Sequence, residues 1–241
     1  MAFICGLKRN KYQPSNILSA NNHNLSLNFE DVLNLPNKCT LLNDCILKNM
    51  MSQKCKDCAS QSTIKHIANF FNLDSKISVE FQYYNARSIA NQNKNEDEGS
   101  SIEDNLKSVI LYGYISDLFH PYNLKQVNEK PTHIIYDVAT KNLKSNKGYL
   151  QTNISHFKYI MANENKTIIF RADIFENVTQ LNEYNNILTI PNTDKDEYIG
   201  SHAMLLICYD NDKNAFQEAN SWPICGGIRY ISYHYNNSYL T

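Results

Sequence analysis

Residues 201–210 read Ser-His-Ala-Met-Leu-Leu-Ile-Cys-Tyr-Asp, and residues 220–222 read Asn-Ser-Trp. The apolar run from Ala203 to Tyr209 is typical of a buried strand. His202 therefore lies at the start of a predicted strand, an end from which its imidazole can enter a cleft. Asn220, 18 positions further on, can accept one imidazole proton and fix the tautomer and the plane of the ring. The tryptophan of the second motif can cover this hydrogen bond and exclude water from it.

Cys58 is the candidate nucleophile that belongs with this histidine. Apolar residues recur at helical spacing just after it, at Ile64, Ile67, Ala68 and Phe71. Cys58 therefore lies at the amino-terminal end of a predicted helix. A thiol attacks an acyl carbon as the thiolate, and both a helix amino terminus and a histidinium lower its pKa. The helix supplies the first of these, and His202, 144 positions later, is expected to supply the second.

These segments resemble the motifs of the papain family of cysteine peptidases. Residues 201–210 are similar to the histidine strand of that family, with Cys208 where glycine is commoner. Residues 220–222 are similar to its asparagine motif, and Gly-Gly-Ile-Arg-Tyr at 226–230 is similar to the glycine-led strand that follows. The separation between the cysteine and the histidine also lies within the roughly 130–150 residues expected for such enzymes.

The middle of the chain is similar to the compact xylellain-like branch of this family. Motifs of that branch occur in the same order as Tyr-Tyr-Asn-Ala-Arg at 83–87, Glu-Asp-Glu-Gly-Ser-Ser-Ile at 96–102 and Pro-Tyr at 121–122. The resemblance extends from about Leu35 to the end of the chain. It implies an α+β, papain-like two-lobed fold, with a helical amino-terminal lobe and an antiparallel sheet or barrel in the carboxy-terminal lobe. The active site would lie in the cleft between the lobes.

The resemblance also assigns roles to individual residues. Cys58, His202 and Asn220 would form a Cys-His-Asn triad supported by Trp222. This triad would hydrolyse peptide bonds through an acyl-enzyme, with a peptide or protein as substrate and with no metal or organic cofactor. The further residues Gly99, Ser100 and Ser201 would bind the substrate. A glycine at 99 suits main-chain recognition because it needs no side-chain clearance.

Gln53 is the expected side-chain donor to the oxyanion, alongside the backbone amide of Cys58. The segment that contains both residues reads Gln-Lys-Cys-Lys-Asp-Cys-Ala from 53 to 59. It lacks the glycine-rich turn that is usual in the family, and Ala59 stands where tryptophan is common. Gln53 also lies one residue nearer to the nucleophile than in typical members.

The hydrophobic pattern predicts an arm, a helical lobe and a strand-rich lobe. Residues 1–34 are expected to be an extension or a short pro-segment-like arm, residues 35–125 the helical lobe, and residues 126–241 the β-rich lobe of one peptidase domain. Helices are predicted at 59–71, 79–90, 102–112 and 155–161, and strands at 167–172, 203–209, 215–219 and 227–233. Four histidines receive no role, His66 and His156 in helices and His120 and His133 in loops.

Composition excludes several other classes of function. The chain has 23 basic and 24 acidic residues, so it carries no electrostatic footprint for nucleic acid. No apolar stretch approaches the roughly 20 residues that span a bilayer, and the amino terminus does not read as a signal peptide. We therefore expect an intracellular or particle-associated protein. Its seven cysteines, an odd number, are expected to be mostly free thiols in a reducing compartment.

Several alternatives accompany this interpretation. Cys58 can be a small buried apolar residue, or Cys55 can be the attacking thiol. Cys39, Cys45, Cys55 and Cys58 can form a four-thiolate zinc site, although no second Cys-x-x-Cys completes the usual spacing. The fold can also serve as a non-catalytic binding or scaffold protein, or as an acyl transferase or isopeptidase.

Overall fold

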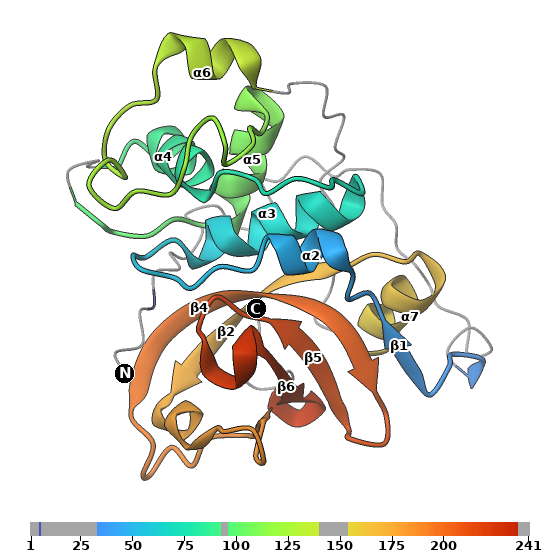
Figure 1. The fold of residues 1–241 in the computed structure, drawn as a ribbon. Coiled ribbons are helices and arrows are strands. Elements are labelled where there is room, and N and C mark those ends of the chain that lie inside the picture. Colours follow the sequence, from blue (N-terminus) through green and yellow to red (C-terminus); the bar gives the residue numbers. More distant parts are fainter. Residues whose placement is uncertain (1–4, 6–32, 93–95, 140–153, 236–241) are drawn as a thin grey trace, which may run out of the picture.

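The computed structural model describes residue 5 and residues 33–92, 96–139 and 154–235. Helices gather on one side of the molecule and strands on the other (Figure 1). The helical lobe contains α2 (Asp44–Lys48), α3 (Cys58–Phe70), α4 (Val79–Ile89), α5 (Ile102–Tyr112) and α6 (His133–Val138). The sheet lobe contains the longer strands together with α7 (Ile154–Asn163). The expected α+β fold with two lobes is confirmed.

Helices α4 and α5 each begin after a serine that caps the helix. The hydroxyl of Ser78 accepts the N–H of Phe81 at the start of α4, and the hydroxyl of Ser101 accepts the N–H of Asp104 at the start of α5. Each hydroxyl satisfies a backbone donor that has no partner within its helix. The helices predicted at 59–71, 79–90 and 102–112 are confirmed as α3, α4 and α5.

His133 was expected in a loop, and that prediction is wrong. It is the first residue of α6, a helix that runs from His133 to Val138. Pro131 directly precedes Thr132, the extended N-cap residue after which the helix begins. Hydrophobic periodicity does not reveal such a helix, because six residues do not complete two turns.

The strands form one sheet with the order β1-β4-β5-β6-β3, and β2 pairs with β4 as well. Their bounds are β1 Lys38–Thr40, β2 Ile168–Phe175, β3 Ile187–Leu188, β4 Tyr198–Asp210, β5 Ala215–Ala219 and β6 Ile228–Ser232. All described pairs are antiparallel except β3 with β6. The described strands therefore make an open sheet rather than the barrel that was the expected alternative, because the path ends at the two-residue β3.

β4 is the central strand and it faces α3. Its residues from Ser201 to Asp210 are all buried, whereas β2 alternates between buried and half-buried positions. A strand that is buried on both faces reads as a continuous apolar run, which explains the sequence after His202. α3 lies between the sheet and the helices α4 and α5 (Figure 1).

Short 3-10 turns complete the sheet lobe at Glu176–Gln180 and Ile224–Gly227. The second turn carries Cys225 and Gly226 at positive φ and leads directly into β6. This turn completes the connection between Asn220 and β6. Among the described residues, no helix is both long and apolar enough to cross a bilayer.

Candidate active site

Cys58 is the first residue of α3 and is fully buried. Asp57 occupies the N-cap position but makes no side-chain capping bond. The thiol therefore lies among the first N–H groups of the helix, where negative charge is favoured. Cys58 packs with Ala59 against Ala203 of β4. The predicted nucleophile thus shares a packed cluster with the residue that directly follows the predicted base.

His202 and Asn220 are brought together as expected. The Nε2 atom of His202 lies 2.9 Å from the Oδ1 atom of Asn220, and both side chains are buried. His202 comes from β4, and Asn220 directly follows β5, which pairs with β4. Trp222 stacks on the imidazole, with 3.9 Å between ring centroids and 18° between ring planes. The tryptophan therefore covers the imidazole and its bond to the amide.

The surroundings of Asn220 determine the orientation of its amide. Oδ1 accepts the backbone N–H of Trp222 at 2.9 Å, and Nδ2 donates to a carboxylate oxygen of Glu218 at 2.9 Å. A backbone donor and a carboxylate acceptor together exclude the flipped amide. Because Oδ1 can only accept, the Nε2 atom of His202 must be the donor. The imidazole is thus held with its proton on Nε2.

The second ring nitrogen of His202 is therefore the basic one. Nδ1 is buried and has no hydrogen-bond partner among the described residues. Burial lowers the pKa of His202 to about 3, and the positive charges of Arg229 and Lys65 act in the same direction. The bond to Asn220 opposes this shift only in part. The ring is neutral in this arrangement, and neutral imidazole is the form that can accept a proton.

Three charged residues behind Asn220 were not predicted. Glu218 and Arg229 are fully buried and form an ion pair through Nε of Arg229. Lys65 of α3 is also fully buried, and its ammonium donates to the carbonyl of Ala219 at 3.2 Å. Burial lowers the pKa of Lys65 to about 8. Glu218 precedes Asn220 by two positions, and Glu218 pairs with Arg229 in the β5–β6 register. A hairpin prediction for these strands is the signal that would have found this ion pair.

The structure is similar to those of several cysteine proteases. Xylellain from Xylella fastidiosa matches with a TM-score of 0.74 and 21% identity, over 89% of this chain and 87% of that one. Procathepsin B S9 from Trypanosoma congolense gives 0.63 and 14%, over 95% and 80% of the chains. The Carica candamarcensis protease CMS1MS2 gives 0.57 and 15%, over 86% and 97%.

The fold is papain-like. The similarity lies in structure rather than sequence, because no protein-family model and no curated protein sequence matches the chain. Identities of this size establish the architecture alone. The cleft that the resemblance implied stays a prediction.

Gln53 lies five positions before Cys58, the first residue of α3. Its side-chain amide nitrogen donates to the carbonyl of Cys55 at 2.7 Å, and its side-chain oxygen accepts the hydroxyl of Ser221 at 2.8 Å. Its backbone N–H also donates to the Ser221 carbonyl at 2.8 Å. These contacts link the segment before Cys58 to the segment after Asn220. The role of Gln53 at the oxyanion stays a prediction.

Gly99 and Ser100 lie immediately before α5. Gly99 has a φ of 84°, a conformation that other residues rarely adopt, and its N–H donates to the hydroxyl of Tyr83 at 3.0 Å. Ser100 is fully buried and accepts the side-chain N–H of Asn105 at 2.8 Å. The hydroxyl of Ser100 thus supports the segment from inside the helical lobe. Their roles in substrate binding stay predictions.

Ser201 precedes His202, so its side chain points to the opposite face of β4. Its hydroxyl donates to Asp173 at 2.6 Å and accepts from Arg171 at 2.8 Å. Arg171 and Asp173 also form an ion pair at 2.6 Å. Ser201 is therefore part of a polar cluster on β2 and β4, and a contact with substrate stays a prediction.

Cys55 has an environment different from that of Cys58. Its sulfur lies 3.4 Å from the hydroxyl of Tyr122, and the residue packs with Tyr83 and Val127 of the helical lobe. Burial raises the pKa of the Cys55 thiol well above its ordinary value, and the nearby Asp57 carboxylate adds to this shift. Such a thiol is a poor nucleophile. Of the two cysteines, Cys58 is the one that packs against β4.

The four cysteines considered for zinc lie in separate parts of the papain-like fold. Cys39 packs on the core of the sheet lobe, Cys45 on the core of the helical lobe, and Cys55 and Cys58 in two further clusters. In the described part of the chain, no group of three or more potential metal ligands gathers. The positions of these four cysteines in four different clusters do not support a tetrahedral thiolate site.

The predicted arm, residues 1–34, lies outside the described residues except for Cys5 and residues 33–34. Cys5 is half-buried and packs against the core of the sheet lobe. A Cβ added to Gly200 would lie 2.7 Å from the Cβ atom of Cys5. Burial, together with the Cys58 thiol, raises the pKa of Cys5 to about 12. Cys5 therefore lies beside β4 at Gly200, two residues before His202.

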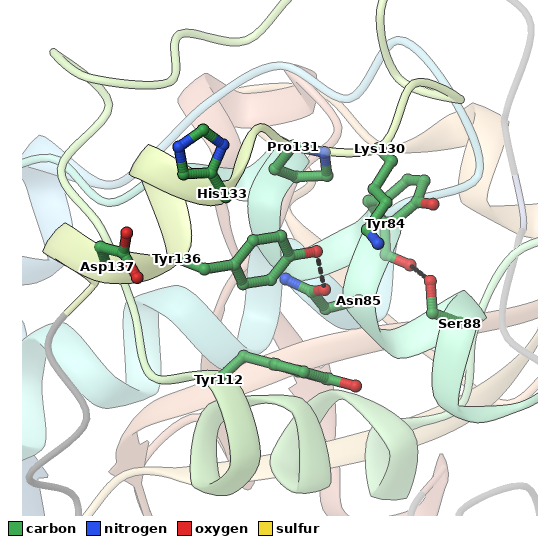
Figure 2. Close-up of a pocket in the computed structure, with 9 residues that line it drawn as sticks. All are labelled: Tyr84, Asn85, Ser88, Tyr112, Lys130, Pro131, His133, Tyr136 and Asp137. Atoms are coloured by element: carbon green, nitrogen blue, oxygen red, sulfur yellow. Dashed lines mark hydrogen bonds between the residues drawn. The ribbon is translucent and has the colours of Figure 1, made fainter.

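A separate pocket of about 470 Å³ lies within the helical lobe (Figure 2). It is lined by Tyr84, Asn85, Ser88, Tyr112, Lys130, Pro131, His133, Tyr136 and Asp137. Two of its polar groups bond to the protein itself, since the Tyr136 hydroxyl donates to Asn85 and the Ser88 hydroxyl donates to the carbonyl of Tyr84. None of the predicted site residues lines this pocket.

Proposed function

We propose that the protein is a thiol-dependent peptide-bond hydrolase, with Cys58 as nucleophile, His202 as base and Asn220 as the residue that orients the base. The observation that carries this proposal is the fixed tautomer of His202. Nε2 is bonded to Asn220 and Nδ1 is the basic nitrogen. The next residue along β4, Ala203, belongs to the same packed cluster as Cys58. The papain-like fold of known cysteine proteases supports the same assignment.

The first half of the reaction forms an acyl-enzyme. Nδ1 of His202 takes the thiol proton of Cys58, and the thiolate attacks the carbonyl carbon of the peptide bond. The backbone N–H of Cys58 and the amide of Gln53 are proposed to donate to the oxyanion. The intermediate collapses when His202 returns the proton to the leaving amine, which breaks the C–N bond and leaves a thioester.

The second half releases the acid. Nδ1 takes a proton from water, and the hydroxide that forms attacks the thioester carbon. The C–S bond then breaks, and the proton on His202 passes to the sulfur. Throughout, Asn220 keeps Nε2 protonated, so the same ring nitrogen accepts and returns each proton. No metal or organic cofactor enters this scheme.

An alkylation experiment tests the proposal directly. We expect iodoacetamide or an epoxide probe to label Cys58 faster than the other thiols at mildly acidic pH, and His202→Ala to abolish this preference. Mass spectrometry of peptides would locate the label. Labelling of Cys58 at the same rate as Cys45 would count against an activated thiol. An added amine separates hydrolysis from acyl transfer, because a transferase would give the amide product, which is detected by its mass.

A scaffold or binding function is the second candidate, and one observation favours it. The carboxyl group of Asp57, fully buried beside the nucleophile, opposes formation of a second negative charge at Cys58. If this function holds, the protein would bind extended peptides without cleaving them. Binding of a labelled peptide, with no product after prolonged incubation and no selective labelling of Cys58, would favour the scaffold.

A further inference from the structure

Two large side chains of α4 organise the segment around Gly99. Tyr83 and Arg87 lie one turn apart, and both are fully buried. The guanidinium of Arg87 lies 4.2 Å from the centre of the Tyr83 ring. Arg87 donates to the carbonyl of Glu96 at 2.9 Å and to the carbonyl of Val127 at 2.6 Å. Arg87 thereby holds the beginning of the segment and also fixes the Tyr83 ring.

The hydroxyl of Tyr83 joins two points of this segment. It donates to the Asp97 carboxylate at 2.5 Å and accepts the N–H of Gly99 at 3.0 Å. The phenolic hydroxyl thus acts as a donor and as an acceptor at the same time. The bond to an ionised acceptor is the stronger of the two. The position of the Gly99 peptide therefore depends on Tyr83.

The same carboxylate reaches the segment that carries the nucleophile. The backbone N–H of Lys56 donates to both carboxylate oxygens of Asp97, at 2.9 and 3.1 Å. Lys56 precedes Cys58 by two positions, and residues 53–57 form no helix or strand. Their position therefore depends on such contacts. A continuous path of hydrogen bonds runs from Gly99 through Tyr83 and Asp97 to Lys56.

We propose that Tyr83 and Asp97 are positioning residues that set the distance between the Gly99 peptide and the Cys58 sulfur. This inference rests on the proposed function, in which an extended substrate pairs with the main chain at Gly99. The Gly99 N–H is already bonded to Tyr83, so the carbonyl of Gly99 is the group that accepts a substrate N–H. The two residues thus align the bound main chain with the nucleophile, although neither touches the reacting atoms.

The test uses Tyr83→Phe, which removes the hydroxyl and keeps the ring that contacts Arg87. For peptides with at least two residues on the acyl side, we expect KM to rise about tenfold, because a partly buried hydrogen bond to a carboxylate is lost. The rate at which iodoacetamide alkylates Cys58 should stay unchanged, because this reagent does not use Gly99. Asp97→Asn, which keeps one acceptor oxygen, should give a smaller rise in KM.

Tyr136→Phe is the matched control. Tyr136 also donates a phenolic hydrogen bond within the helical lobe, to Asn85 at 2.8 Å, and it lies in the separate pocket (Figure 2). Its KM and alkylation rate should equal those of the wild type. An unchanged KM in Tyr83→Phe, or an equal loss of alkylation and of peptide turnover, would overturn the proposal.

Hydrogen exchange tests the positioning role of Tyr83 independently of peptide cleavage. If the wild-type protein cleaves no peptide, the proposed hydrolase fails, but the bonds of Tyr83 can still be tested. Exchange of the segments 54–57 and 96–101 should be faster in Tyr83→Phe and unchanged in Tyr136→Phe. Equal exchange in both variants would show that Tyr83 does not hold these segments together.

Discussion

Glu218 and Arg229 form a fully buried ion pair directly behind the hydrogen bond that joins Asn220 to His202. One carboxylate oxygen of Glu218 accepts from both Asn220 and Arg229. The guanidinium also lies 5.5 Å from the centre of the Trp222 ring. The amide that orients the imidazole is thus itself held by a pair of charges inside the sheet lobe.

Breaking this pair should cost far more stability than removing it whole. Glu218→Gln leaves the guanidinium buried without a counter-charge, and we expect the free energy of unfolding to fall by about 3–5 kcal/mol. Combining Glu218→Gln with Arg229→Met should restore part of that loss, because the guanidinium that loses its counter-charge is removed as well. Urea unfolding of the single and double variants measures both effects. Costs that simply add would contradict this prediction.

Asn220→Ala should lower kcat strongly and lower stability only slightly. Loss of the amide frees the imidazole to rotate and to change tautomer, so kcat should fall by a large part of the roughly 10²–10⁴-fold that base catalysis supplies. The free energy of unfolding should fall by only about 1–3 kcal/mol, since one buried carboxylate loses a donor. Steady-state kinetics and thermal unfolding of the same preparation check both. An undiminished kcat would remove Asn220 from the mechanism.

Asp57 should make stability depend on pH. Burial raises its pKa from 3.8 to about 6, so the folded state binds this proton more tightly than the unfolded state. Stability from this group is therefore fully present below pH 3.8 and is lost as pH rises to about 6. The change amounts to roughly 3 kcal/mol. In Asp57→Asn this component should vanish, so the variant should gain stability relative to the wild type as pH rises from 4 to 7. A constant difference between the two proteins over that range would contradict the assignment.

Removal of residues 1–34 should raise activity. Cys5 lies against Gly200, two positions before His202. A chain segment in this position would compete with an extended substrate for the cleft. We expect the shortened protein to show a lower KM for peptides and faster alkylation of Cys58. Equal values for the full and the shortened chain would exclude an inhibitory arm.

The parts of the fold that periodicity controls could be predicted from the sequence. α3 and α5 have apolar residues at helical spacing, and β4 is a continuous apolar run because both of its faces are buried. The short elements carry no such signal. β1 and β3 have three and two residues, so only their partners in the sheet define them.

Some contacts of the candidate site could also be predicted from the sequence, and others could not. His202 and Asn220 could be paired because a hairpin brings adjacent strands together, and their spacing fits one turn between β4 and β5. Glu218 and Arg229 read as exposed charges on strands, and only the sheet register shows that they neutralise each other. The bonds of Tyr83 join segments that are separate in sequence. Which partner its hydroxyl meets depends on packing of α4 that no local pattern encodes.

α3 belongs to the interior of both lobes. On one side Ser60 donates to Asn105 of α5 at 2.6 Å, and on the other Ser62 donates to the carbonyl of Ala203 at 3.0 Å. Lys65 reaches the sheet in the same way. Separating the lobes would strip hydrogen bonds from the same helix that presents Cys58. The two halves should therefore melt as a single calorimetric transition, and entry to the cleft should come from displacement of surface segments rather than from a hinge between rigid bodies.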